Sequence, residues 1–230
     1  MAFDLKSEED VKEYLENIGI EYRFDCYSEK KPESCQLLGE YLESIKNDFD
    51  KALKVYKNNC DEYKYPRSCL KYVILGLRGK APKITPAEAI SYLEKGCAAG
   101  CGESCAGAAE LNITEAHKPQ QGNDNKEVLD KAVQMMHRGC ELNFPFACYY
   151  LSAAHISGRD YIGIKKDMKA AFQFADKACR LGNLEACVNL SQMYMRGDGV
   201  EQDVEKGRIY RTKAEDMMPD TRRRKVVFSQ

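Results

Sequence analysis

The stretch "MKAAFQFADKACRLGNLEACVNLSQMYMRG", residues 168–197, contains two amphipathic segments on either side of a short Gly-Asn turn. In both segments apolar residues recur at helical spacing, and the second segment ends on glycine, which commonly follows the end of a helix. Cys179 closes the first segment and Cys187 opens the second. The stretch therefore predicts two antiparallel helices, with one cysteine on each side of the turn between them.

This arrangement of cysteines recurs along the chain, which has 230 residues and 11 cysteines. Ten of them form pairs whose members lie eight or nine positions apart: Cys26 and Cys35, Cys60 and Cys69, Cys97 and Cys105, Cys140 and Cys148, and Cys179 and Cys187. The first members of successive pairs are 34, 37, 43 and 39 positions apart, and Cys101 is left over. A near-constant spacing of this kind is typical of repeat proteins.

Each repeat is expected to consist of two helices. The segments before the first cysteine of a pair are amphipathic, and they carry an alanine eight positions ahead of it, namely Ala52, Ala89, Ala132 and Ala171. A small residue at that position allows two helix backbones to approach closely. Since a helix pair cannot bury its apolar face alone, neighbouring pairs must stack. The sequence predicts an all-α solenoid of five helix pairs, at about residues 33–66, 67–102, 103–145, 146–183 and 184–217.

The two ends of the chain differ from the repeats. In residues 1–32, Ser7 followed by Asp10 predicts a helix N-cap with an acidic first turn, and hence an N-terminal capping helix. Residues 218–230 contain "RRRK" and show no helical period, so we expect a flexible basic tail there.

Residues 186–214 resemble the Sel1-like repeat, whose pattern runs from alanine, leucine, a small residue, tyrosine and glycine to Gly-Val, aspartate and Lys-Ala. The matching residues are Ala186, Leu190, Ser191, Tyr194, Gly197, Gly199, Val200, Asp203, Lys213 and Ala214. The fourth repeat matches through Ala147, Leu151, Ser152, Gly158, Asp167, Lys177 and Ala178. The third repeat departs most, with Asn112 at the tyrosine position and a polar insertion, "KPQQGNDN". The resemblance covers about residues 33–215 and implies a right-handed α/α solenoid of Sel1-like repeats.

The cysteines can pair in two ways, because the end of each second helix lies beside the start of its own first helix and of the next one. Pairing within repeats would leave Cys26 and Cys187 without partners, whereas pairing across the short loops uses all ten. Position 215, where a further cysteine would fall, holds a glutamate. We therefore predict the disulfides 26–35, 60–69, 97–105, 140–148 and 179–187, which would staple the solenoid together.

Two alternatives to disulfides remain for these cysteines. They could be small, reduced core residues at positions where the family normally has alanine. They could also bind zinc, although structural zinc sites favour C-x2-C spacing and the three histidines form no ligand pair. We expect no metal site.

Within the Sel1-like family, the chain resembles the mitochondrial cytochrome c oxidase assembly factor 7 group. The stretches that carry this resemblance are "YLENIGIE", "CYSEKKPESC", "FDKALKVYKNNC" and "QMYMRGDGV". The resemblance implies a factor of the mitochondrial intermembrane space that supports assembly of respiratory complex IV. Its expected partners are complex IV assembly components and the disulfide-relay import machinery of that compartment.

The composition and the N-terminus agree with this location. Oxidised cysteines need an oxidising compartment, yet "MAFDLKSEEDVKEYL" has neither the apolar core of a signal peptide nor the Arg-rich character of a transit peptide. The formal net charge of -1 gives no reason to expect nucleic acid as a partner. No apolar run is long enough to span a membrane, and we expect a monomer.

Two side chains are candidates for chemistry beyond protein binding. Cys101 has no partner in the predicted scheme, and as a free thiol it could attack a neighbouring disulfide. His117, near the polar insertion, is the candidate haem ligand. His155 is expected to be a core histidine, and His137 lies beside Met135 and Met136, which are expected to fill the core. Together these features give an alternative function, that of a haem-binding thiol–disulfide reductase.

Other catalytic functions find little support in the sequence. Penicillin-binding hydrolase activity, as claimed for bacterial cysteine-rich Sel1-type proteins, would require an export signal that this N-terminus lacks. Nothing resembles a phosphate-binding loop or a nucleophile with its base, so we expect a scaffold rather than an enzyme.

Overall fold

The computed structural model describes residues 7–79, 82–118 and 125–218. Within these ranges it contains helices and one isolated β-bridge but no β-strand, which confirms the predicted all-α fold. The first helices of the five pairs are α2 (Pro32–Ser44), α4 (Pro66–Leu77), α6 (Gly102–Ala116), α8 (Pro145–Ser157) and α10 (Leu184–Arg196). The second helices are α3 (Phe49–Tyr63), α5 (Pro86–Ala98), α7 (Lys126–Glu141), α9 (Met168–Arg180) and α11 (Val204–Met217).

Two further elements lie outside these pairs. α1 (Glu8–Tyr27) precedes the first pair, and a short 3-10 helix, η1 (Asp160–Ile162), lies between α8 and α9. Ser7 caps α1, because its hydroxyl oxygen accepts a hydrogen bond from the Asp10 N–H at 3.3 Å, as the sequence predicted. Of the expected basic tail, only Met218 is among the described residues. Of the third-repeat insertion, only the first and last residues, Lys118 and Asn125, are described.

Proline starts three of the first helices. Pro32, Pro66 and Pro145 occupy the first turn of α2, α4 and α8, where the missing N–H of proline costs no helical hydrogen bond. Each proline lies three positions before the second cysteine of its pair. These helices therefore begin three residues earlier than the cysteine pattern suggested, and the second cysteine lies inside the first turn.

Aspartate caps the second helices of the repeats that match the Sel1 pattern best. The Asp167 carboxylate accepts hydrogen bonds from the N–H groups of Lys169 and Ala170, and the Asp203 carboxylate accepts one from Lys206. These backbone hydrogen bonds hold the pKa of both carboxyl groups below its usual value. The aspartate of the Sel1 pattern is thus the residue that starts the second helix.

The small residues of the repeats lie where the two helices of a pair meet. Ala52, Ala89, Ala132 and Ala171 are fully buried, as expected from their register. In the fourth pair, the Ser152 hydroxyl donates a hydrogen bond to the Ala171 carbonyl at 2.8 Å. In the fifth pair, the Ser191 hydroxyl donates to the Gly207 carbonyl at 2.7 Å. In these two pairs the serine of the Sel1 pattern therefore ties the first helix to the backbone of the second helix.

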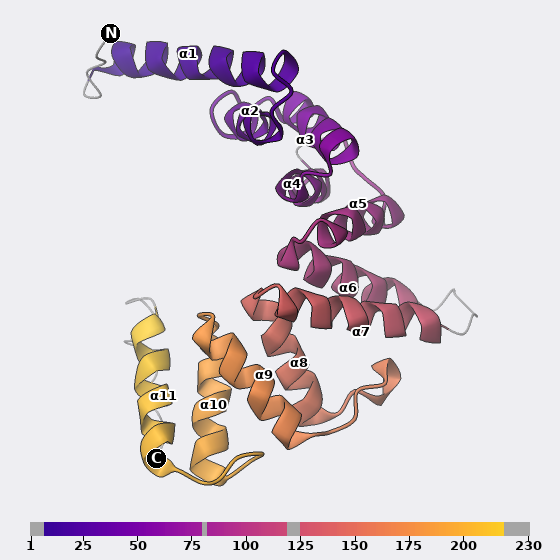
Figure 1. Cartoon of the computed structure of the whole chain (residues 1–230), viewed down its shortest axis with the longest axis vertical. Helices are drawn as coiled ribbons and strands as arrows, with labels where there is room; N and C mark the ends of the chain where they lie inside the picture. The colour runs from indigo at the N-terminus through magenta and orange to yellow at the C-terminus, as the bar shows by residue number, and fades with distance from the viewer. Residues whose placement is uncertain (1–6, 80–81, 119–124, 219–230) are drawn as a thin grey trace. The chain divides into compact units, whose positions relative to one another are not determined.

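The chain divides into two compact units, residues 1–104 and 105–230. Consecutive helices pack against each other from α1 to α5 in the first unit and from α7 to α11 in the second (Figure 1). In the first unit α3 also contacts α5, and in the second unit α8 also contacts α10, as in stacked helix pairs. None of the described helices is both long and apolar enough to cross a bilayer.

Disulfides join the end of one helix to the start of the next helix across each short turn. The first unit contains Cys26–Cys35 between α1 and α2 and Cys60–Cys69 between α3 and α4. The second unit contains Cys140–Cys148 between α7 and α8 and Cys179–Cys187 between α9 and α10. Cys97 and Cys105 are each disulfide-bonded as well. All ten of these cysteines are buried.

Removal of one disulfide should destabilise the chain measurably. The variant Cys179→Ala/Cys187→Ala is expected to lose about 2–3 kcal/mol of unfolding free energy, because the unfolded chain regains the entropy of an open loop. Urea denaturation under non-reducing conditions measures this loss. With dithiothreitol present, which reduces every disulfide, the wild-type chain should fall below the oxidised variant and match the reduced variant. Unchanged wild-type stability under reduction, or peptide mapping that joins Cys35 to Cys60, would contradict the pairing.

Gly199 should tolerate alanine far less well than Gly182 does. Both glycines have positive φ angles, +73° and +93°, so alanine is strained at either position, by about 1–2 kcal/mol. A Cβ on Gly199 would also overlap the backbone carbonyl of Met168, whereas a Cβ on Gly182 would meet nothing within 4 Å. Gly199→Ala is therefore expected to cost about 1–3 kcal/mol more than Gly182→Ala in urea denaturation. Equal losses for the two variants would show that α9 does not approach Gly199 this closely.

Candidate functional site

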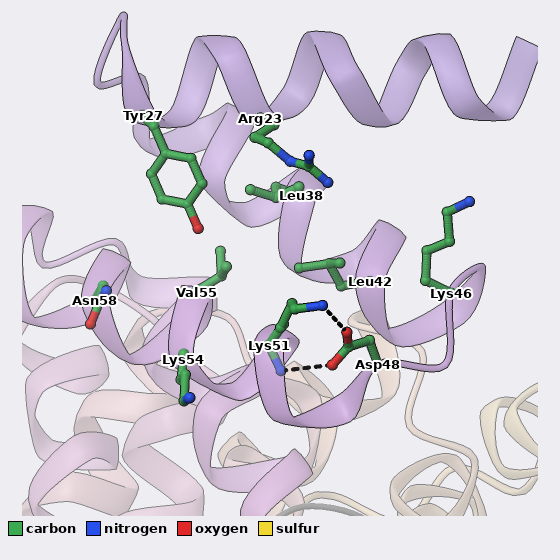
Figure 2. Close-up of a pocket in the computed structure, with 10 residues that line it drawn as sticks. All are labelled: Arg23, Tyr27, Leu38, Leu42, Lys46, Asp48, Lys51, Lys54, Val55 and Asn58. Atoms are coloured by element: carbon green, nitrogen blue, oxygen red, sulfur yellow. Dashed lines mark hydrogen bonds and ion pairs between the residues drawn. The ribbon is translucent and has the colours of Figure 1, made fainter.

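A groove of about 540 Å³ lies in the first unit, where α1, α2 and α3 meet (Figure 2). α1 contributes Arg23 and Tyr27, and α2 contributes Leu38 and Leu42. The remaining lining residues come from α3 and the turn before it: Lys46, Asp48, Lys51, Lys54, Val55 and Asn58. We call this site the α1–α3 groove.

The floor of the α1–α3 groove is apolar. Leu38 and Leu42 lie one helical turn apart on α2, so both side chains point to the same side, and Val55 of α3 lies opposite them. All three are buried, with 1, 7 and 5% of their surface exposed. By contrast, Tyr27 at the wall is 59% exposed. The floor belongs to the packed core, and the tyrosine is available to a bound molecule.

The rim of the α1–α3 groove is cationic. It carries four cationic side chains and the single carboxylate of Asp48. Asp48 accepts hydrogen bonds from the Lys51 ammonium at 2.7 Å and from the Lys51 N–H at 3.1 Å, and this pairing lowers the pKa of its carboxyl. Arg23 and Lys54 form no salt bridge within the part of the chain that the structure describes. An anionic group entering the groove would therefore meet positive charge from both α1 and α3.

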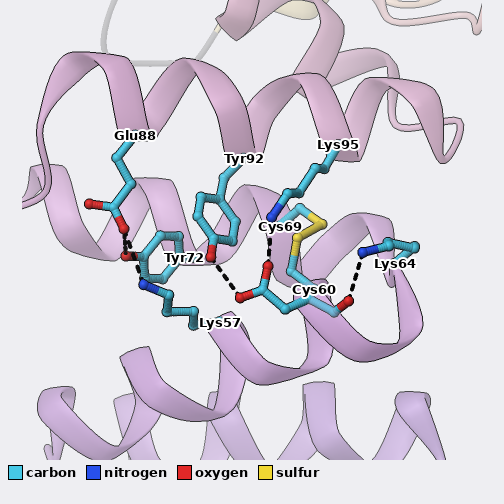
Figure 3. Close-up of polar contacts among 9 residues, drawn as sticks. Lys57, Cys60, Lys64, Cys69, Tyr72, Glu88, Tyr92 and Lys95 are labelled. Atoms are coloured by element: carbon cyan, nitrogen blue, oxygen red, sulfur yellow. Dashed lines mark hydrogen bonds and ion pairs between the residues drawn. A yellow bond between two sulfur atoms is a disulfide. The ribbon is translucent and has the colours of Figure 1, made fainter.

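A second polar cluster connects α3, α4 and α5 in the same unit (Figure 3). The Tyr72 hydroxyl donates to the Glu88 carboxylate at 2.6 Å, and the Lys57 ammonium donates to the same oxygen at 3.2 Å. The Tyr92 hydroxyl and the Lys95 ammonium donate to Asp61 at 2.7 and 2.6 Å, beside the Cys60–Cys69 disulfide.

The charges of this cluster are matched internally. Burial and the adjacent carboxylates raise the pKa of Tyr72 and Tyr92, so both hydroxyls stay protonated as donors. Burial alone would raise the pKa of Asp61, but the hydrogen bonds from Lys95 and Tyr92 outweigh burial and lower it. Each carboxylate is thus satisfied by one tyrosine and one lysine. The cluster holds three helices together, and we assign it a structural role.

Cys101, the candidate reactive thiol, is a free and partly exposed cysteine. It directly precedes α6, and its sulfur accepts a hydrogen bond from the Ser104 N–H at 3.4 Å. The disulfide-bonded Cys97 and Cys105 are each four positions away in the sequence. The structure therefore presents a thiol at the start of a helix.

His117, the candidate haem ligand, lies directly after α6 and is exposed, as its position beside the insertion suggested. Its Nδ1 lies 2.5 Å from the Ile113 carbonyl oxygen, and its ring meets that of Tyr161 edge-on at 4.9 Å between centroids. One ring nitrogen is thus already engaged, which leaves Nε2 for any ligand.

The structure brings His137 and His155 together, although the sequence analysis treated them as separate core residues. Both rings contact Phe174, with centroid distances of 5.6 and 5.7 Å. Both side chains are half-buried, so His155 is more exposed than a core histidine. Burial and the nearby His155 lower the pKa of His137. Among the described residues, no three His, Cys, Asp or Glu side chains are grouped so that they could hold a metal ion.

Sequence reasoning missed the α1–α3 groove, because α1 was interpreted only as a cap. One signal was present in the sequence. Ile20, Phe24 and Tyr27 follow the i, i+4, i+7 spacing of one helix face, and they are 63, 58 and 59% exposed. A capping helix with a second, exposed apolar face can be expected to bind another molecule through that face.

Comparison with known proteins identifies the repeats and the relatives of the chain. The family model for the Sel1 repeat matches residues 76–101, 145–183 and 184–217. The cytochrome c oxidase assembly factor 7 homolog of Drosophila melanogaster is 43% identical over 97% of this chain and 94% of its own length. Cytochrome c oxidase assembly factor 7 of Homo sapiens is 34% identical over 93% of this chain and 92% of its own length.

A solved structure supports the same fold. The crystal structure of a Sel1 repeat protein from Oxalobacter formigenes superposes with a TM-score of 0.68, covering 89% of this chain and 82% of that protein, at 21% identity. This likeness confirms the predicted α/α solenoid as the fold, and it carries no information on activity. The chain, which matches its curated relatives over nearly its full length, belongs to the cytochrome c oxidase assembly factor 7 family of Sel1-repeat proteins.

Proposed function

We propose that the chain is a scaffold of the mitochondrial intermembrane space that supports assembly of cytochrome c oxidase by binding other proteins. The observation that carries this proposal is the near full-length similarity to relatives named as assembly factors of that complex. Stacked helix pairs offer long side-chain-lined surfaces, which repeat proteins commonly use to hold protein partners. The expected partners are complex IV assembly components.

The disulfides support the proposed compartment. Ten of the 11 cysteines are disulfide-bonded and buried, and such bonds persist only where the surroundings are oxidising. The intermembrane space is the mitochondrial compartment that forms disulfides in imported proteins through a relay of thiol–disulfide exchange. Import of this chain would therefore depend on that relay, which makes the relay proteins a second class of partner.

Depletion of the chain should lower the amount of assembled cytochrome c oxidase. Native gels and oxidase activity in mitochondria from depleted cells measure this loss, with citrate synthase and complex III as controls. Re-expression of the wild-type chain is expected to restore the complex. An equal loss of every respiratory complex, or no loss at all, would contradict a specific role in complex IV assembly.

The same cells can test the compartment. Protease added to intact mitochondria should leave the chain whole, and rupture of the outer membrane should expose it while a matrix protein stays protected. A chain that resists protease after rupture, or that is digested before it, lies elsewhere.

A second candidate function is that of a haem-binding thiol–disulfide reductase, which the free thiol of Cys101 favours. His117 would supply an axial ligand for haem through Nε2. A reductase needs an electron donor, for which reduced glutathione is the natural choice in a test. A scaffold would need neither the free thiol of Cys101 nor His117 as a haem ligand.

The variant Cys101→Ser separates these two functions. If the chain acts as a scaffold, this variant should restore cytochrome c oxidase as fully as the wild type, because Cys101 takes no part in the disulfides. Its thermal unfolding should match that of the wild type. Failure to restore the complex, together with loss of turnover of a disulfide substrate at unchanged stability, would favour the reductase.

A further inference from the structure

The α1–α3 groove combines an apolar floor with positive charge on both sides. Leu38 and Val55 form part of the floor, and Tyr27 stands exposed at the wall (Figure 2). Arg23 reaches the groove from α1, and Lys54 lies across from it on α3. A molecule that fills this groove must therefore offer apolar groups to the floor and anionic groups to the rim.

The apolar surface continues from the groove along α1. Tyr27 belongs to the groove, and it also forms one exposed helix face with Ile20 and Phe24. Large exposed side chains of this kind mark interaction surfaces. Helix faces pack best against other helices, whose ridges fit the grooves between side-chain rows. The shape of this surface favours a helix as the occupant.

The cationic side chains of the groove determine which charge the bound helix should carry. Lys51 is neutralised by Asp48 at 2.7 Å, and Lys46 lies 3.9 Å from Glu16 of α1. Arg23 and Lys54 form no salt bridge among the described residues, although the charge of Lys54 also helps to lower the pKa of the Asp48 carboxyl. These two cationic residues, 31 positions apart in the sequence, line the groove from α1 and α3. An acidic partner would gain from both, and a basic partner would be repelled by both.

We propose that the α1–α3 groove is the docking site for an acidic amphipathic helix of a partner protein. The helix would place its apolar side against Tyr27 and the exposed face that it forms with Ile20 and Phe24, and its carboxylates beside Arg23 and Lys54. This proposal deepens the scaffold function proposed above and rests on it.

Other occupants fit the groove less well. The C-terminal residues of this chain include Arg222, Arg223, Arg224 and Lys225, which carry the same charge as the rim. A membrane surface is flat and would not follow a groove between helices. A small phosphate ion would leave Phe24 and Tyr27 exposed. An acidic helix satisfies the rim, the floor and the exposed face together.

Binding of designed peptides to the full, oxidised chain tests the proposal. The probes are three fluorescent peptides, each long enough to form an isolated helix. One is an amphipathic helix with glutamates opposite leucines, one has lysines in place of the glutamates, and one has the acidic composition in scrambled order. Fluorescence anisotropy should show the acidic amphipathic peptide binding at least about tenfold more tightly than the other two.

Variants then locate the binding. Arg23→Glu/Lys54→Glu should weaken binding of the acidic amphipathic peptide about tenfold, because two attractions become repulsions. Tyr27→Ala should weaken it as well, through loss of apolar contact. The matched control is Lys83→Glu/Lys165→Glu, which makes the same change in net charge at two exposed lysines outside the groove and should leave binding unchanged. Circular dichroism melting confirms that every variant is folded.

Several results would overturn the docking site. Equal binding of the acidic and basic peptides would remove the charge argument, and equal binding of the scrambled peptide would remove the helix. Equal weakening by the control variant would place the effect outside the groove. Loss of binding to anionic phospholipid vesicles in the groove variant, with no discrimination among peptides, would point to a membrane. A wild-type dimer in light scattering that the groove variant breaks would mean that a second copy fills the site.

The depleted cells separate failure of this proposal from failure of the proposed function. If the wild-type chain restores cytochrome c oxidase and the groove variant does so equally well, the scaffold function stands and the groove proposal falls. If the wild-type chain does not restore the complex while peptide discrimination holds, the assembly function falls and the docking site stands.

Discussion

The disulfide across each short turn is the constraint on which the rest of the structure depends. The residues that bring the helices together are small, as with Ala171 and Ala186, and each therefore removes little apolar surface from water. The cysteines that follow them, such as Cys179 and Cys187, are themselves fully buried and form part of the core. A covalent bond at this position fixes one helix pair to the next where large apolar side chains would not fit.

Different forces act within the pairs and between them. Within a pair, a serine hydroxyl bonds to the backbone of the facing helix, as Ser152 does to Ala171 at 2.8 Å. Between pairs, the sulfur–sulfur bond adds a link that does not depend on close shape complementarity. Hydrogen bonds between pairs, such as that from Tyr92 to Asp61, need helices already in contact, whereas the disulfide keeps the next pair near enough for contact to form.

The elements that could be predicted are those whose signal is local and repeated. The period of the cysteines gave the number of pairs, and the alanines eight positions ahead of them gave the buried face, because helical spacing places such residues in a fixed relation. The helix starts were predicted less well, since proline in the first turn decided them rather than the cysteine. The α1–α3 groove was out of reach, because Arg23 and Lys54 come to line one groove only when α1 and α3 both pack against α2. The contact of His137 and His155 with Phe174 depends in the same way on three helices.

Two lysine-containing sites of the first unit show how partners decide the role of a charge. Lys57 and Lys95 each lie against a carboxylate and an aromatic ring, and their cluster closes on itself between α3 and α5. Lys54 lies on the same helix as Lys57, three positions away, but it lines the α1–α3 groove, to which Arg23 of α1 adds a second cation. Sequence alone shows two lysines on one helix. The neighbouring helices make one of them structural and leave the other open to a partner.

α1 links the formation of a disulfide to the shape of the α1–α3 groove. It forms one wall of the groove, and it is bound covalently to α2 through Cys26 and Cys35. Among the described helices α1 packs mainly against α2, whereas α2 and α3 each pack against helices on both sides. A helix with so few contacts opens more easily than the helices of the array, so the disulfide carries a larger share of its attachment. The groove is therefore best defined in the oxidised chain, and a docking surface of this construction is suited to a compartment that forms disulfides.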